Sequence, residues 1–208
     1  MSESGDRRAR VAERLRETVE RLLEAGEAYA SISIERLMSE SDLSRSTFYA
    51  YFSDKSDLLQ EWSREIAAAT RTAGTTWTQM EGPFERDALR DALRRVMVAY
   101  RPHAALASAA YDATVYDERL RVDVTAVIDS HRDAVAEHVR RGQREGWVDA
   151  TLLPDQTAAW LVWMTERVFH QHLARVAEDA EFDALVEGFA DVVWNALHAP
   201  VVRLAAAS

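Results

Sequence analysis

Apolar residues recur at helical spacing along most of the chain, and this repeat constrains the fold more than any other feature of the sequence. The first stripe consists of Val11, Leu15, Val19 and Leu22, and further stripes follow as far as Val193. Steps of three and four residues place apolar side chains on one face of an amphipathic helix. No segment alternates between apolar and polar residues regularly enough to indicate a β-strand. The sequence therefore predicts an all-α fold.

The breaks between these stripes coincide with residues that disfavour helix. Prolines stand between the apolar stripes, where a residue without an amide donor is tolerated, at Pro83, Pro102, Pro154 and Pro200. We interpret Gly74, Gly82 and Gly146 as marking the same breaks. We predict about nine helices, at residues 8–28, 33–40, 44–51, 54–73, 84–101, 103–113, 117–144, 154–176 and 181–198.

Composition narrows the class of protein. The 208 residues contain no cysteine, which excludes disulfides and cysteine-ligated metals. No apolar run approaches the length of a membrane span, and the first residues are polar, so we expect a cytoplasmic protein with no membrane partner. The net charge of −10 argues against a protein that coats nucleic acid. DNA binding would require a local basic surface instead.

The helices predicted near the N-terminus are shorter than those that follow. Two very short helices joined by a tight turn occupy residues 33–52, whereas long helices follow. We therefore predict two domains, an N-terminal three-helix helix-turn-helix domain at residues 1–55 and a larger helical domain at residues 56–208. The helix that begins near Asp54 would belong to both.

The segment from Ser33 to Leu59 is typical of a helix-turn-helix. Ser33 and Ser44 are suited to cap the two short helices, because a serine oxygen can accept a bond from an amide of the first turn. Asp42 lies in the turn and tolerates a left-handed backbone. Phe48 and Phe52, spaced i and i+4, would anchor the second helix to the core. In such a motif the first residues of the second helix reach base edges in the major groove.

The side chains left outward suit contact with DNA. Arg45 can donate two hydrogen bonds to a guanine edge, and Thr47 offers a hydroxyl and a methyl to thymine. Tyr49, Tyr51 and Lys55 can contact phosphates, and we expect Arg7, Arg8 and Arg10 to form a basic arm before the first helix. The candidate DNA-binding residues are Ser33, Ser44, Arg45, Ser46, Thr47, Tyr49, Tyr51 and Lys55.

The run SRSTFYAYFSDKSDLL resembles the signature of the TetR family of transcriptional regulators. The matching positions are Ser44, Thr47, Phe48, Tyr49, Tyr51, Phe52, Lys55 and Leu58. The chain departs from the family in the turn, where Ser41-Asp42-Leu43 replaces the usual Ala-Gly-Val. By sequence the resemblance covers about residues 8–60, and beyond them only the number and length of the helices agree.

The resemblance implies a ligand-responsive regulator, typically a repressor. Such a protein binds a pseudo-palindromic operator in double-stranded DNA as a homodimer and is released by a small effector. Residues from about 60 onward would hold the effector, and the last two long helices would dimerise. Effector binding would swing the helix that begins near Asp54 and change the separation of the recognition helices.

The sequence supports dimerisation independently, because residues 158–164 are apolar on every face of their helix and need cover on all sides. The effector site is indicated less directly, by aromatic, methionine and polar residues on the inner stripes. These candidate effector-binding residues, which also suit an ordinary core, are Met97, Tyr100, Tyr111, His131, Trp160, Trp163, Met164, Arg167 and Trp194. We expect a mostly apolar or aromatic effector.

An all-helical enzyme and an adaptor that does not bind DNA are the alternatives. The sequence has no His-Glu-x-x-His motif, no paired Glu-x-x-His motifs and no phosphate-binding glycine loop, so we predict no catalytic residue, cofactor or metal. Glu166 and His170 share one helix face. We interpret Glu137-His138 and the pair His170 and His172 as solvated polar faces.

Overall fold

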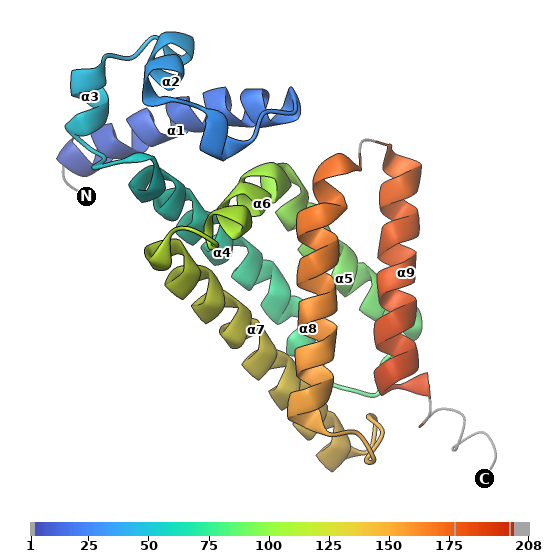
Figure 1. The fold of residues 1–208 in the computed structure, drawn as a ribbon. Helices are drawn as coiled ribbons and strands as arrows, with labels where there is room; N and C mark the ends of the chain where they lie inside the picture. The colour runs from blue at the N-terminus through green and yellow to red at the C-terminus, as the bar shows by residue number, and fades with distance from the viewer. Residues whose placement is uncertain (1–2, 177, 200, 202–208) are drawn as a thin grey trace. The chain divides into compact units, whose positions relative to one another are not determined.

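The computed structural model describes residues 3–176, 178–199 and 201, and within these ranges the chain is helical with no β-strand. The all-α prediction is confirmed. The helices, coloured along the chain in Figure 1, are α1 (Glu3–Glu24), α2 (Ile34–Ser41), α3 (Arg45–Tyr49), α4 (Lys55–Thr78), α5 (Arg86–Tyr100), α6 (Ala104–Ala113), α7 (Glu118–Glu145), α8 (Pro154–Gln171) and α9 (Asp179–Leu197).

The chain forms two compact units. The first contains the described residues up to Ile66 together with His103–Val124, and the second contains Ala67–Pro102 and the described residues from Thr125 onward. Helices α4 and α7 each contribute to both units, because the divisions fall inside them.

The first unit is built around α1 and the N-terminal half of α4. Leu15 of α1, Phe48 of α3 and Trp62 of α4 are fully buried. The Trp62 indole Nε1 donates to the Ala12 carbonyl at 3.2 Å, so the largest core side chain also satisfies its polar atom. Near the starts of α4 and α7, Arg119 donates to the carboxylate of Asp54 at 3.1 Å. The first bond joins α4 to α1, and the second joins the start of α7 to the residue before α4.

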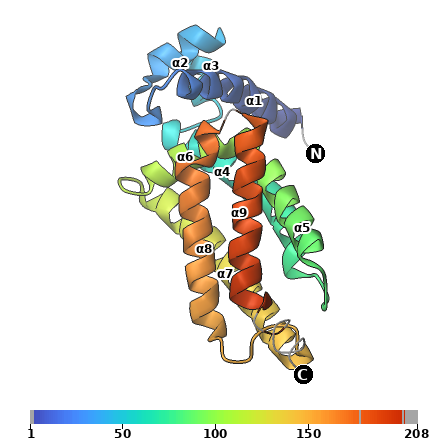
Figure 2. The same ribbon diagram turned by 90° about the vertical axis from the view of Figure 1, so that its right-hand side faces the viewer.

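The second unit is a helical bundle. Helices α8 and α9 run side by side in both views, and α5 packs along α9 (Figures 1 and 2). Leu93 and Met97 of α5 and Val193 of α9 are buried, as the apolar spacing requires. Arg86 of α5 ties the two helices further through Asp191, at 2.7 Å. Among the described residues, no helix is both long and apolar enough to cross a bilayer.

Three details of the predicted organisation are wrong. Helix α1 already begins at Glu3, so Arg7, Arg8 and Arg10 lie within a helix and form no arm before it. The helix ends at Glu24, before the predicted residue 28, because Gly26 adopts φ +87° and stops it. Gly74 marks no break, since α4 continues through it to Thr78. Pro200 lies outside the described residues.

Candidate DNA-binding surface

Helices α2 and α3 form a helix-turn-helix whose local geometry agrees with the predicted caps. The Ser33 hydroxyl accepts from the Arg36 amide at 3.1 Å, and the Ser44 hydroxyl accepts from the Thr47 amide at 3.0 Å. Asp42 ends α2 in the left-handed region, at φ 53° and ψ 42°. The three local predictions are therefore confirmed, including an aspartate in the turn where a glycine is more usual.

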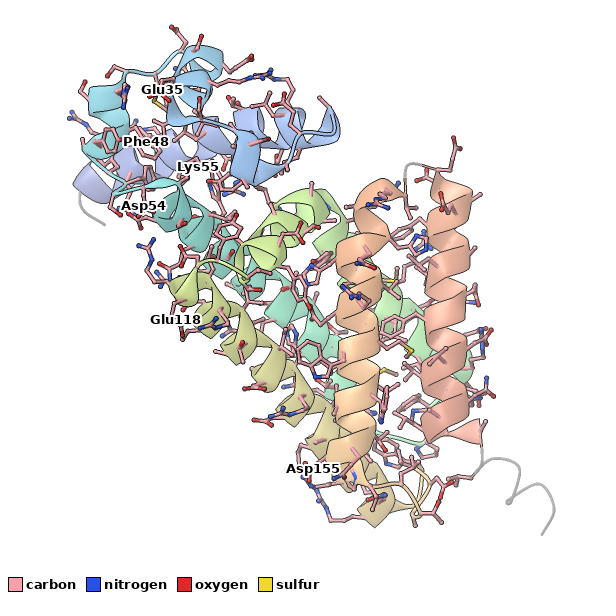
Figure 3. All side chains as sticks on the ribbon, in the orientation of Figure 1. Glu35, Phe48, Asp54, Lys55, Glu118 and Asp155 are labelled. Atoms are coloured by element: carbon pink, nitrogen blue, oxygen red, sulfur yellow. The ribbon has the colours of Figure 1, made fainter. Side chains whose placement is uncertain are left out.

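Helix α3 is short and is held by its aromatic anchors. Phe48 (labelled in Figure 3) and the following Phe52 are 0% and 1% exposed, as predicted, and their ring centroids lie 5.6 Å apart. The remaining candidates divide by exposure. Ser33, Ser44, Arg45, Ser46 and Tyr49 are exposed, while Thr47, Tyr51 and Lys55 are partly buried.

Arg45 opens α3 beside a carboxylate that the sequence analysis overlooked. Its Nη1 lies 2.7 Å from Glu35 Oε1 on α2, and both side chains are more than half exposed. Hydrogen bonding to the Glu35 backbone and the charge of Arg45 lower the pKa of Glu35, so this carboxylate is ionised. The Arg45 guanidinium is thus paired with a carboxylate of the neighbouring helix.

The hydroxyls at the start of α3 are linked to one another. Ser44 Oγ lies 2.7 Å from Ser46 Oγ and 2.8 Å from Thr47 Oγ1. Each hydroxyl can both donate and accept, so this small network can rearrange its protons around a bound acceptor without moving its heavy atoms.

Lys55 has a role that its position in the motif does not reveal. The ammonium of Lys55 (labelled in Figure 3) donates to the carbonyls of Tyr29, at 3.0 Å, and of Ile32, with a longer contact to the Ala30 carbonyl. The Tyr29 hydroxyl donates back to the Lys55 carbonyl at 2.8 Å, and burial lowers the pKa of the ammonium. A phosphate contact by this ammonium would have to compete with three backbone carbonyls.

A basic groove of about 280 Å³ lies between α1 and the helix-turn-helix. Arg7, Arg10 and Arg14 line one side, and Thr47 and Tyr51 line the other. Arg8 has a different role, because its Nε donates to Glu61 at 2.6 Å and its guanidinium stacks over the Phe52 ring. Arg14 was not among the predicted residues, although its place four residues after Arg10 and seven after Arg7, on the same helix face, was the available signal.

The candidate effector residues do not gather at one place. Tyr111 belongs to the first unit and the other eight to the second. Met97 and Tyr100 are buried, whereas Trp160, Trp163 and Met164 are 80%, 49% and 40% exposed. Arg167 is exposed as well, and His131 and Trp194 are intermediate.

Two of these residues belong to a hydrogen-bonded chain inside the second unit. Tyr100 Oη lies 3.0 Å from His170 Nδ1, and His170 Nε2 lies 3.0 Å from Glu166, which is also 3.5 Å from His131. Burial alone would raise the Glu166 pKa, but the hydrogen bonds from both histidines outweigh it and lower the pKa to about 2. The sequence placed Glu166 and His170 on one helix face, but it did not indicate their partners Tyr100 and His131 on other helices.

The solvated interpretation of two histidines is wrong. The His170 side chain is only 9% exposed, and His138 is 1% exposed inside a cluster with Trp77 and Trp147. Both positions follow helical spacing on an inward face, and polarity alone gave the wrong prediction. His172 and Glu137 are exposed, in agreement with it.

The sequence matches no protein-family model and no curated protein. Solved structures, in contrast, share the fold. A TetR-family regulator from Mesorhizobium loti MAFF303099 has a TM-score of 0.67 at 14% identity, with 95% of this chain and 100% of that chain covered. PfmR, a TetR-family regulator from Thermus thermophilus, has a TM-score of 0.71 at 17% identity, covering 86% and 96%.

A transcriptional regulator from Saccharomonospora viridis, solved in complex with choline, has a TM-score of 0.64 at 19% identity, with coverage of 88% and 96%. The chain therefore has the fold of the TetR-family regulators, as its helix-turn-helix signature implied.

Proposed function

We propose that the protein is a transcriptional regulator that binds a pseudo-palindromic operator as a homodimer and is released by a small effector. Residues 1–55 would read DNA, and residues 56–208 would bind the effector and dimerise. The observation that carries the proposal is the helix-turn-helix, with capped α2 and α3, a buried Phe48 and the polar start of α3 in solvent. Repression is the mode we propose, after the family's common behaviour.

The local distribution of charge supports DNA as the partner, although the chain as a whole is acidic. The three arginines of the basic groove lie next to the recognition helix, where phosphates of a bound duplex would pass. Arg45 and Tyr49 stand exposed on that helix. The net charge of −10 disfavours indiscriminate binding away from this surface.

The exposed apolar residues of α8 support a homodimer. Trp160, at 80% exposure, and Trp163 lie on one helix with Met164, and Val192 of the adjacent α9 is 43% exposed. Large apolar side chains gathered on neighbouring helices usually mark an interface. A second copy applying the same two helices would cover them with a self-complementary patch.

The effector would be mostly apolar, with its polar part directed to the Glu166 network. Tyr100 and Phe169 supply aromatic surface, with ring centroids 4.9 Å apart, beside the buried carboxylate of Glu166. Aromatic faces together with a carboxylate favour a ligand that carries a positive charge. The choline bound to the Saccharomonospora viridis regulator is of this chemical class.

The first experiment is a selection of bound sequences from a random duplex pool with the full-length protein. We expect a two-fold symmetric motif, which fluorescence anisotropy should then confirm as salt-sensitive binding. Arg45→Ala should change the preferred base at one position of each half-site, while Arg175→Ala, which replaces an exposed arginine outside the first unit, should retain the wild-type motif. A wild-type protein that enriches no sequence would contradict the proposed function.

The oligomeric state is tested separately by sedimentation equilibrium. We expect a dimer that Trp160→Glu converts to a monomer, since a carboxylate would be buried in the interface without a partner. Val115→Glu serves as the control, because Val115 is 84% exposed but lies outside α8 and α9. A wild-type monomer would exclude the proposed assembly.

A further inference from the structure

The residues of the candidate DNA surface fall on two different faces. Thr47 and Tyr51 are four residues apart and both line the basic groove. Arg45 and Tyr49 are also four residues apart, but they are exposed and do not line it. About one helical turn separates the members of each pair, with Tyr51 two residues beyond the end of α3, and the two pairs point in different directions.

The groove itself has the chemistry of a phosphate site. Arg7, Arg10 and Arg14 follow steps of three and four residues, so their guanidinium groups lie along one face of α1. A guanidinium presents a planar fork of donors that matches two phosphate oxygens. The hydroxyls of Thr47 and Tyr51 are further donors on the opposite wall.

One arginine of the groove pairs with a carboxylate of the helix-turn-helix. Asp42 lies 3.6 Å from Arg14, and its side chain is 98% exposed. So exposed an ion pair is weak and can be exchanged for a contact with a ligand. The groove is also open, and its lining is more apolar than polar, with Leu43 and Val11 beside the arginines.

Building on the proposed DNA binding, we propose that this groove clamps a backbone phosphate of the operator and that Thr47 and Tyr51 belong to the clamp. Base readout then falls to the other face of α3, which carries Arg45, Ser46 and Tyr49. Thr47 thereby changes from the predicted reader of thymine to a positioning contact. The phosphate contacts set the register of the helix, and the other face selects the sequence.

Salt dependence tests the clamp, with Arg10→Gln compared with Arg21→Gln. Both substitutions remove one exposed arginine of α1, but Arg21 pairs with Glu40 at 2.9 Å and does not line the groove. Arg10→Gln should weaken binding to selected and scrambled duplexes by the same factor. It should also reduce the slope of log affinity against log salt by about 0.9 for each protomer bound. Arg21→Gln should retain the wild-type slope, and equal slopes for the two variants would overturn the clamp.

Sequence preference tests the division between the faces. Tyr51→Phe removes one hydroxyl from the groove, and we expect a uniform loss of affinity with the wild-type base preference intact. Arg45→Ala should change the preferred base at one position of each half-site. A changed preference in Tyr51→Phe, or an unchanged one in Arg45→Ala, would overturn the assignment of the faces.

Two further outcomes separate this inference from its premise. A wild-type protein that binds no duplex overturns the proposed function itself, whereas the variant results above concern only the clamp. Inorganic phosphate at matched ionic strength should displace DNA no better than chloride. Stronger displacement from wild type than from Arg10→Gln would identify a site for free phosphate and overturn the assignment to the DNA backbone.

Discussion

Half-buried Lys55 in the first unit and fully buried His138 in the second satisfy their polar atoms in opposite ways. The Lys55 ammonium keeps its charge and donates to backbone carbonyls in the segment before α2. His138 donates through Nδ1 to the Thr78 carbonyl at 3.0 Å, but its Nε2 is buried and has no hydrogen-bond partner among the described residues. His198 repeats this pattern with the Trp147 carbonyl at 3.1 Å.

The difference shows what each site contributes to the fold. A charged group with satisfied donors fixes the position of its acceptors, so Lys55 joins the start of α4 to the segment that leads into α2. A neutral imidazole with one bare nitrogen adds packing but resists protonation, since a second N–H would find no acceptor. The contacts of Lys55 therefore hold two segments of the first unit together, whereas the buried imidazole of His138 makes the free energy of unfolding depend on pH.

Acid provides the largest expected effect. Burial lowers the His138 pKa to about 4, and the His198 pKa is lowered for the same reason. The unfolded chain therefore binds protons between about pH 6.5 and pH 4 that the folded chain does not, and stability is lost as the pH falls through this range. We expect about 2 kcal/mol less free energy of unfolding at pH 5 than at pH 7 from His138 alone. Denaturant unfolding at the two pH values measures it.

His138→Phe isolates this contribution. The variant keeps an aromatic ring among Trp77 and Trp147 but cannot titrate, so the difference between pH 7 and pH 5 should shrink by the amount that His138 supplied. His172→Gln, a change at an exposed histidine, should keep the wild-type difference. Burial also lowers the pKa of half-buried His103 in the first unit. This residue should therefore leave a smaller loss of stability on acidification in the His138→Phe variant. An unchanged pH difference in His138→Phe would contradict the assignment.

Lys55→Met should have the next largest effect, in the first unit. Methionine keeps the length of the side chain but leaves the three carbonyls without their shared donor. Because the site is only half-buried and water can replace part of the loss, we expect about 1–2 kcal/mol of destabilisation. Hydrogen exchange should show faster opening at residues 29–59 and little change at α8 and α9. Loss of DNA affinity without any change in exchange would instead indicate that the ammonium contacts phosphate directly.

Local features of the fold could be predicted from the sequence, and features that depend on distant partners could not. Ser33, Ser44 and Asp42 were assigned correctly because a cap or a turn is decided within four residues. The carbonyls that hold Lys55 lie 23 to 26 residues away, and no local pattern reports them. The same limit explains His138, whose Thr78 partner is 60 residues distant and whose burial depends on how α7 packs.

In the candidate site, too, features decided by neighbouring residues could be predicted, and features that depend on distant residues could not. The outward position of Arg45 on α3 followed from helical spacing around Phe48. The groove did not, because it requires α1 and the helix-turn-helix to meet in three dimensions. Its third arginine, Arg14, and the role of Arg8 against Phe52 and Glu61 became visible only with that packing.

The smallest expected effect concerns the exposed ion pair of Glu35 and Arg45, which provides the solvent-exposed counterpart to Lys55. Solvent screens so exposed a pair, so Glu35→Gln should leave the free energy of unfolding almost unchanged. Its consequence should appear in DNA recognition, because the carboxylate holds the guanidinium that faces the bases.

Glu40→Gln is the matched control for Glu35→Gln. It removes the same charge from α2, but Glu40 pairs with Arg21 and not with Arg45. Both variants should bind random duplex slightly more tightly as repulsion of phosphate falls, and only Glu35→Gln should weaken the preference for the base that Arg45 reads. Equal preferences in the two variants would mean that Arg45 finds its base without help from Glu35.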